Sequence, residues 1–148
     1  MVNKQLLFSD IELGQEFSDT YIASSEKVQQ FLDANRTLER TEIEDGRFTS
    51  KEGASTLGLE KPILPGVMSM SIISKLITDI IAPNGKLHKL DASFRRPVFH
   101  NDSLSLSALV VDTVIEEDKG IIKLDVALEN DRGEKPLQGT AVVELPIK

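Results

Sequence analysis

Apolar and polar residues alternate along four segments in the second half of the chain. Every second residue in each segment is apolar, which is the pattern of a β-strand with one buried face. The apolar positions are Leu90, Ala92 and Phe94, then Leu104 to Val110, Ile122 to Leu128 and Gly139 to Leu145. Short links at residues 118–120 and 130–133 suit hairpins, so the last three strands are predicted to form an antiparallel meander.

The segment before these strands has the pattern of a long helix. Residues from Gly66 to Ala82 are apolar around most of the helix circumference, and Pro83-Asn84-Gly85 ends the run. A helix that is apolar on nearly every side is expected to be buried on nearly every side. We therefore predict that the strands wrap around this helix.

The first third of the chain adds shorter elements. Residues 16–22 suggest a strand, and Ser24 or Ser25 is placed to cap a following helix. Residues 49–52 fit a capping box that opens a short helix ending at Gly58. Together these elements predict an α+β protein with the hot-dog fold, a long central helix wrapped by a curved antiparallel β-sheet, in a single domain spanning residues 1–148.

Composition and charge limit the partners, ligands and cellular location that we expect for this protein. The net charge of −7 disfavours nucleic acid and anionic membrane as partners, because both bind cationic surfaces. The chain has no cysteine, and its two histidines lack ligand spacing, so neither a metal nor a cofactor is expected. The N-terminus does not resemble a signal peptide, and Lys75 and Asp79 interrupt the longest apolar run, so we expect a cytoplasmic protein.

The start of the central helix is the main candidate site. Amides in the first turn have no partner within a helix and lie at the positive end of its dipole. Gly66 would let a ligand approach these amides closely, and an oxygen that gains negative charge would be stabilised there, as in an oxyanion hole. The apolar helix behind Gly66 could line a slot for an acyl chain. The predicted substrate-binding residues are Phe48, Leu64, Pro65, Val67, Met68 and Arg96, with Arg96 and Lys61 as candidate phosphate contacts.

Over roughly residues 8–145 the chain resembles the MaoC-like hydratases and dehydratases, a family of hot-dog proteins. The matching positions are residues 8–17, Phe31, Ala54, Gly58-Leu59, Pro62-Ile63, Pro65 to Met68, Phe94, Arg96 to Val98 and Asp102 to Leu104. The resemblance implies addition of water to trans-2-enoyl thioesters, or its removal from (R)-3-hydroxyacyl thioesters. It further implies that an aspartate and a histidine, in a pattern like D-x-N-P-x-H, hold the water. The amide of the glycine matched by Gly66 would polarise the thioester carbonyl.

The aspartate–histidine dyad of the family is not found in this chain. Counting back from Gly58 places the histidine position on Phe48 and the aspartate position on Ile43. Counting forward from Phe31 places both positions six residues earlier, where there is again no aspartate–histidine pair. Neither phenylalanine nor isoleucine can transfer a proton, so the chain lacks the proton-transfer dyad on which the family's hydration reaction depends.

Other titratable residues are candidate replacements. Glu44 and Asp45, with Glu42, cluster in the loop near the expected site, and one of them could act alone as general acid and base. The alternative is a solvated acidic loop. His100 lies at a turn and is expected to be exposed, and His88 is expected on a strand face without an evident partner.

Three serines on the central helix invite a nucleophile interpretation. Ser69, Ser71 and Ser74 have no base nearby in sequence and no Gly-x-Ser-x-Gly elbow. We interpret them as small packing residues or as hydroxyls bonded back to the helix.

Three functions remain open. The first is an atypical enoyl hydratase or 3-hydroxyacyl dehydratase acting on thioesters of coenzyme A or acyl carrier protein in fatty acid metabolism. The second is a non-catalytic acyl-binding protein or partner subunit of a heteromeric dehydratase. The third is a hot-dog thioesterase, which would need a carboxylate near the helix start. A single hot-dog sheet has free edges, so we expect a homodimer or a heterodimer with a related subunit.

Overall fold

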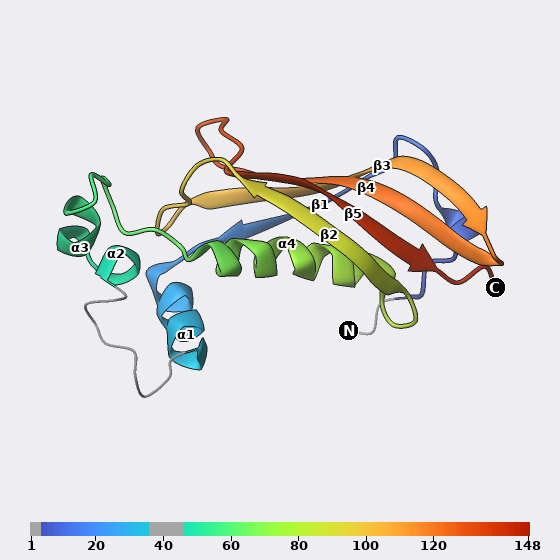
Figure 1. Cartoon of the computed structure of the whole chain (residues 1–148), viewed down its shortest axis with the longest axis horizontal. Coiled ribbons are helices and arrows are strands. Elements are labelled where there is room, and N and C mark those ends of the chain that lie inside the picture. The colour runs from blue at the N-terminus through green and yellow to red at the C-terminus, as the bar shows by residue number, and fades with distance from the viewer. Residues whose placement is uncertain (1–3, 36–45) are drawn as a thin grey trace.

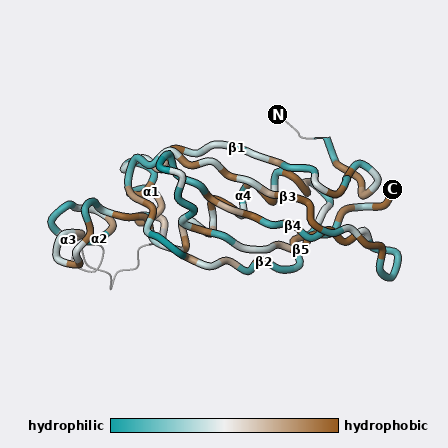
Figure 2. The backbone as a smooth tube through the Cα atoms, turned by 90° about the horizontal axis from the view of Figure 1, so that it is seen from above, coloured by the Kyte–Doolittle hydropathy of each residue, from teal (hydrophilic) through white to brown (hydrophobic). Residues whose placement is uncertain are grey.

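One curved antiparallel sheet and one long helix dominate the structure (Figure 1). The structure is a computed structural model that describes residues 4–35 and 46–148. The strands are β1 (Glu16–Ile22), β2 (Lys86–Phe94), β3 (Ser103–Glu116), β4 (Lys119–Glu129) and β5 (Leu137–Leu145). Their order across the sheet is β1-β3-β4-β5-β2, and all neighbours are antiparallel (Figure 2). The predicted meander of the last three strands is confirmed.

Alternation places one face of the sheet in the core. Leu106 pairs with Leu128, and Leu124 pairs with Ala141, so buried positions of neighbouring strands lie side by side. The even-numbered apolar positions of β3 up to Val110 and all those predicted for β4 are buried. The pattern is weaker in β2, where Leu90 and Ala92 are half-buried and Phe94 is exposed, because β2 is an edge strand.

The central helix α4 (Gly66–Ile81) lies against this inner face (Figure 1). Its buried residues are Met68, Ser69, Ile72, Ile73, Leu76, Ile77, Ile80 and Ile81. Residues on the opposite side, including Val67, Ser71 and Lys75, are exposed. The expectation of burial on nearly every side was therefore wrong. The sheet curves over only one side of the helix, and the chain has no second layer for the other side in its described part.

Three short helices lie near the start of α4. In α1 (Ser25–Asn35) the Ser24 hydroxyl accepts the Lys27 amide at 3.2 Å, and Val28 and Leu32 are buried. The sequence did not predict α2 (Gly46–Thr49), which is only four residues long. The predicted cap of α3 (Lys51–Ser55) is present, since the Gly53 amide donates to the Ser50 hydroxyl at 3.0 Å. A 3₁₀ turn, η1 (Phe8–Asp10), precedes β1.

An extended segment ties the start of α4 to the connection between β2 and β3. Ile63 forms a bridge with Phe99, and the Leu64 amide donates to the Val98 carbonyl at 2.8 Å. The His100 amide donates to the Pro62 carbonyl at 3.1 Å. These bonds fix the first turn of α4 beside the wall formed by residues 95–98.

None of the helices in residues 4–35 and 46–148 is long and apolar enough to cross a membrane.

Candidate functional site

The first turn of α4 carries free hydrogen-bond donors. The Pro65 carbonyl accepts the amides of Met68 at 3.0 Å and Ser69 at 3.3 Å. Among the described residues, no acceptor lies within hydrogen-bond reach of the Gly66 or Val67 amide. Gly66 is also exposed. These two amides are therefore available to an acceptor on a ligand, at the positive end of the helix dipole.

A pocket of about 350 Å³ adjoins Gly66. A Cβ built on Gly66 would lie 3.6 Å from Cε1 of Phe94, so the aromatic ring forms the wall facing the helix start. The lining residues are Ile63, Leu64, Gly66, Ser69, Phe94, Arg95, Arg96, Pro97 and Val98. The pocket is shallow and mixes apolar walls with two arginines, so it offers both apolar and cationic surface to a ligand.

A second hollow runs between α1 and α4. It also measures about 350 Å³, and its walls include Tyr21, Phe31, Met68 and Ile72. The lining is mainly apolar, with Lys27 and Lys75 at its border. Its lining suits an apolar group, and the shared helix α4 links it to the Gly66 pocket.

The structure separates the predicted binding residues into groups. Leu64 and Arg96 line the Gly66 pocket, whereas Met68 lines the α1–α4 hollow. Pro65 is buried and caps α4. Val67 is 68% exposed and lines neither hollow. Phe48 lies in the core and also lines neither.

Phe48 is the residue that counting back from Gly58 assigns to the histidine position of the family. Its side chain is 6% exposed, and the Arg47 guanidinium lies 4.2 Å from the centre of its ring. Phe48 is therefore an aromatic residue of the core, and the Arg47 guanidinium stacks on its ring. Ile43, Glu44 and Asp45 lie outside the described residues.

His100 is buried, contrary to the prediction of an exposed turn histidine. Its Nδ1 lies 2.9 Å from the Ser25 hydroxyl oxygen at the start of α1. Its Nε2 is the one fully buried side-chain nitrogen or oxygen in the described chain without a hydrogen-bond partner. Burial lowers the pKa of His100, and the nearby Phe48 backbone carbonyl opposes this shift. The prediction failed because packing of α1 and α2 over the turn, rather than the turn sequence, determines the burial.

The Gly66 pocket has no acid–base dyad of described residues. None of its lining residues is an aspartate, glutamate or histidine. His88 is far along β2 and, contrary to expectation, has a partner, since its Nε2 lies 2.9 Å from a Glu144 carboxylate oxygen. That hydrogen bond lowers the pKa of Glu144. Residues 4–35 and 46–148 contain no group of three or more histidines and carboxylates placed to hold a metal ion.

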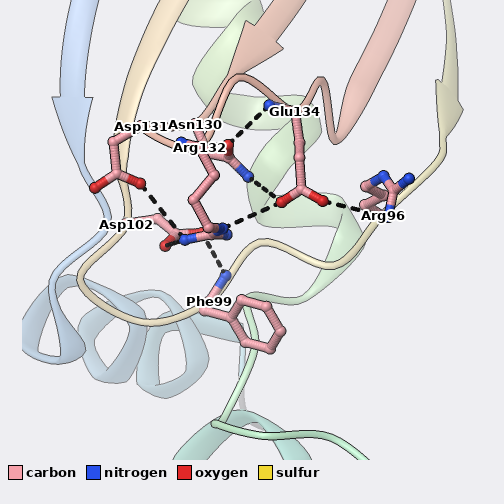
Figure 3. A network of polar contacts seen from close by, with 7 residues as sticks. All are labelled: Arg96, Phe99, Asp102, Asn130, Asp131, Arg132 and Glu134. Atoms are coloured by element: carbon pink, nitrogen blue, oxygen red, sulfur yellow. Dashed lines mark hydrogen bonds and ion pairs between the residues drawn. The ribbon is translucent and has the colours of Figure 1, made fainter.

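A polar network supports the wall opposite Gly66 (Figure 3). Asp102 is 4% exposed, accepts the Phe99 amide at 2.9 Å and binds the Arg132 guanidinium at 3.1 Å. The Arg132 guanidinium also lies 5.7 Å from the centre of the Phe99 ring. Hydrogen bonds to Asp102 and then to Glu134 raise the pKa of Arg132. The β4–β5 loop is thereby tied to the segment that carries the pocket wall.

The same network neutralises Arg96, the predicted phosphate contact. A nitrogen of its guanidinium lies 3.2 Å from a Glu134 carboxylate oxygen. Hydrogen bonds from Asn130 and Arg132 lower the pKa of Glu134, which keeps this carboxylate ionised. Arg95, by contrast, has no charged partner within the described chain and also lines the pocket. Arg95 is thus the freer of the two cations at this rim.

Comparisons with solved structures agree on the fold. R-hydratase PhaJ1 from Pseudomonas aeruginosa superposes with a TM-score of 0.80 at 19% identity, over 97% of this chain and 88% of that one. The C-terminally truncated HadBC (3R-hydroxyacyl-ACP dehydratase) complex from Mycobacterium tuberculosis superposes with a TM-score of 0.69 at 17% identity, over 89% of this chain and 96% of that one. The predicted α+β hot-dog architecture is confirmed.

Sequence comparison defines the family. The sequence model of the MaoC like domain matches residues 48–131, which is more than half of the chain. The chain belongs to this family. An (R)-specific enoyl-CoA hydratase from Aeromonas caviae is 32% identical over 94 residues, which are 63% of this chain and 69% of the relative.

Sequence reasoning did not assign Phe94 or Ser69 to the site. The alternation predicts Phe94 on the buried face of its strand, and Ser69 is predicted to be a small residue that permits close packing. The spacing of three residues between Gly66 and Ser69 was a usable signal, since such residues share one face of a helix. No sequence signal placed Phe94 opposite Gly66, because that contact depends on how the end of β2 meets the start of α4.

Proposed function

We propose that this protein binds an acyl thioester, carried by coenzyme A or acyl carrier protein, with the thioester carbonyl at the Gly66 amide. The single observation that carries this proposal is the pair of unpaired amides at the start of α4, exposed to a pocket. Donors fixed in this way bind a carbonyl oxygen and bind it more strongly as it gains charge. The identity to the hydratase from A. caviae supports the choice of an acyl thioester.

The geometry favours a subunit that binds the acyl group and depends on another chain for proton transfer. The described residues at Gly66 supply donors and apolar walls but no general acid or base. Phe48, the residue that counting back from Gly58 assigns to the histidine position, is packed in the core and cannot transfer a proton. The heteromeric HadBC dehydratase complex has the same fold, which supports a related arrangement here.

The partner would be a second hot-dog subunit. In the described chain β1 and β2 are the edges of the sheet, and each pairs with one neighbour only. The uncovered side of α4, including Val67 and Lys75, adds a surface that a second subunit could bury. We therefore propose a heterodimer with a dyad-bearing relative for the partner-subunit function, or a homodimer for a self-sufficient enzyme, acting in the cytoplasm.

A second candidate is a self-sufficient hydratase or dehydratase. The 32% identity to an (R)-specific enoyl-CoA hydratase favours it. In that case Glu44 or Asp45 would act as the general acid and base. A thioesterase finds no support, because the first turn of α4 carries no acidic residue.

Hydration of crotonyl-CoA, followed at the enoyl absorbance, separates the two candidates. If the protein is a partner subunit, the purified protein alone should bind butyryl-CoA but should not hydrate crotonyl-CoA. If the protein is a self-sufficient hydratase, it should hydrate crotonyl-CoA, and the turnover should fall strongly in Glu44→Gln or Asp45→Asn. Turnover by the wild type alone would overturn the partner-subunit proposal, and absence of butyryl-CoA binding would overturn both candidates. Glu60→Gln, an exposed change outside the loop, serves as the control.

A further inference from the structure

Ser69 differs from the other serines of α4. The Ser71 hydroxyl donates to the Val67 carbonyl at 2.9 Å, and the Ser74 hydroxyl donates to the Met70 carbonyl at 2.8 Å. This back-bonding is the usual way in which a helical serine satisfies its hydroxyl. The equivalent carbonyl for Ser69 is that of Pro65, which already accepts the amides of Met68 and Ser69. Within the described chain no hydrogen bond joins the Ser69 hydroxyl to another residue.

The unpartnered hydroxyl belongs to a buried residue that lines the ligand pocket. Ser69 is 4% exposed, yet it contributes to the lining of the pocket shared by Gly66 and Phe94. The hydroxyl oxygen itself keeps some accessible surface, because His100 Nε2 is the one fully buried and unpartnered side-chain atom among the described residues. Here the small exposed part of the residue faces the pocket, so a ligand oxygen in the pocket is the natural partner.

We propose that the Ser69 hydroxyl is a second hydrogen-bond donor to the acyl thioester, acting on the same carbonyl oxygen as the Gly66 amide. The two residues lie three apart on α4, so one turn of the helix presents both donors to one pocket. A carbonyl oxygen has two lone pairs and accepts two such bonds. The site then recognises a thioester carbonyl and discriminates against a thioether of the same length. This inference rests on the proposed function.

The test compares two ligands and four proteins by isothermal titration calorimetry. Butyryl-CoA has the carbonyl, and S-butyl-CoA has a methylene in its place. Ser69→Ala should bind butyryl-CoA roughly 3- to 10-fold more weakly than the wild type, as expected for the loss of one neutral hydrogen bond. It should bind S-butyl-CoA as the wild type does. Ser74→Ala removes a hydroxyl that is already bonded within the helix, away from both hollows, and it should bind butyryl-CoA like the wild type.

Ser69→Thr provides the rescue, because it keeps the hydroxyl and should restore part of the affinity for butyryl-CoA. Thermal unfolding of each variant verifies that it is folded at the temperature of titration. Equal affinity of wild type and Ser69→Ala for butyryl-CoA would overturn the inference and leave the proposed function in place. The same loss for both ligands would also overturn it, since it would show a packing role. A wild type that binds neither ligand would overturn the inference together with the proposed function.

Discussion

The Phe94 ring faces Gly66 so closely that a Cβ added to the glycine would lie 3.6 Å from Cε1 of Phe94. This is an ordinary van der Waals separation, and the amide of residue 66 is unaffected by a methyl side chain. We expect Gly66→Ala to fold with an unchanged or higher thermal midpoint, because alanine favours helix over glycine. Differential scanning calorimetry measures this, and a clear drop in the midpoint would show that the helix start needs glycine for folding.

Burial on one side of α4 gives a second prediction. Ile73 is completely buried against the sheet, so Ile73→Ala should lower the free energy of unfolding by about 2–5 kcal/mol. Val67 is 68% exposed, so Val67→Ala should change it by less than about 0.5 kcal/mol in the unpartnered chain. Urea titrations of both variants provide the comparison. A similar cost at both sites would contradict the one-sided burial.

His100 predicts a pH dependence of stability. Burial lowers its pKa in the folded state below the ordinary value of 6.5. As the pH falls below 6.5, the unfolded chain binds a proton that the folded chain excludes, so stability is lost. The lowered pKa values of Glu134 and Glu144 act only below their ordinary 4.5.

Urea midpoints measured from pH 7 downward would test this dependence. His100→Gln should flatten the decline that begins near pH 6.5, whereas His88→Gln, which removes the exposed histidine, should keep it. An unchanged profile in His100→Gln would contradict the assignment to the buried imidazole.

The network around Asp102 predicts a local change in protection. The Phe99 amide donates to Asp102, so Asp102→Ala should speed hydrogen exchange at Phe99 and lower the thermal midpoint. Asp131→Ala is the matched control, because Asp131 is exposed and its oxygen lies 3.4 Å from Arg132 at the rim of the network. Equal exchange rates in the two variants would show that Asp102 does not hold the pocket wall.

Much of the sheet could be predicted because burial on one face imposes a period of two. Strands β3 and β4 lie inside the sheet, and their alternation is regular from Leu104 to Val110 and from Ile122 to Leu128. Edge strands bury less, so β2 only partly follows its pattern and Phe94 is exposed. The apolar residues of α4 indicated a buried helix but could not indicate how many of its sides the chain itself covers.

The role of Gly66 stays a prediction, and most of the residues that line the pocket beside it were not predicted. Gly66 was identified because a glycine in the first turn of a helix has a physical consequence that can be read from the sequence. The roles of Phe94, Ser69 and His100 depend on contacts between residues distant in the chain. Ser25 and His100, for example, are 75 residues apart, and no pattern of apolar and polar positions in the sequence predicts their hydrogen bond.

The central claim is that the Gly66 amide binds the thioester carbonyl. Proline is tolerated in the first turn of a helix and lacks the amide hydrogen, so Gly66→Pro removes the donor, and Gly66→Ala keeps it. Difference infrared spectroscopy of bound butyryl-CoA with a ¹³C-labelled carbonyl reports the hydrogen bond directly. The carbonyl stretch should move to lower wavenumber in the wild type and Gly66→Ala, and much less in Gly66→Pro. An equal displacement in Gly66→Pro, or none in the wild type, would contradict the account.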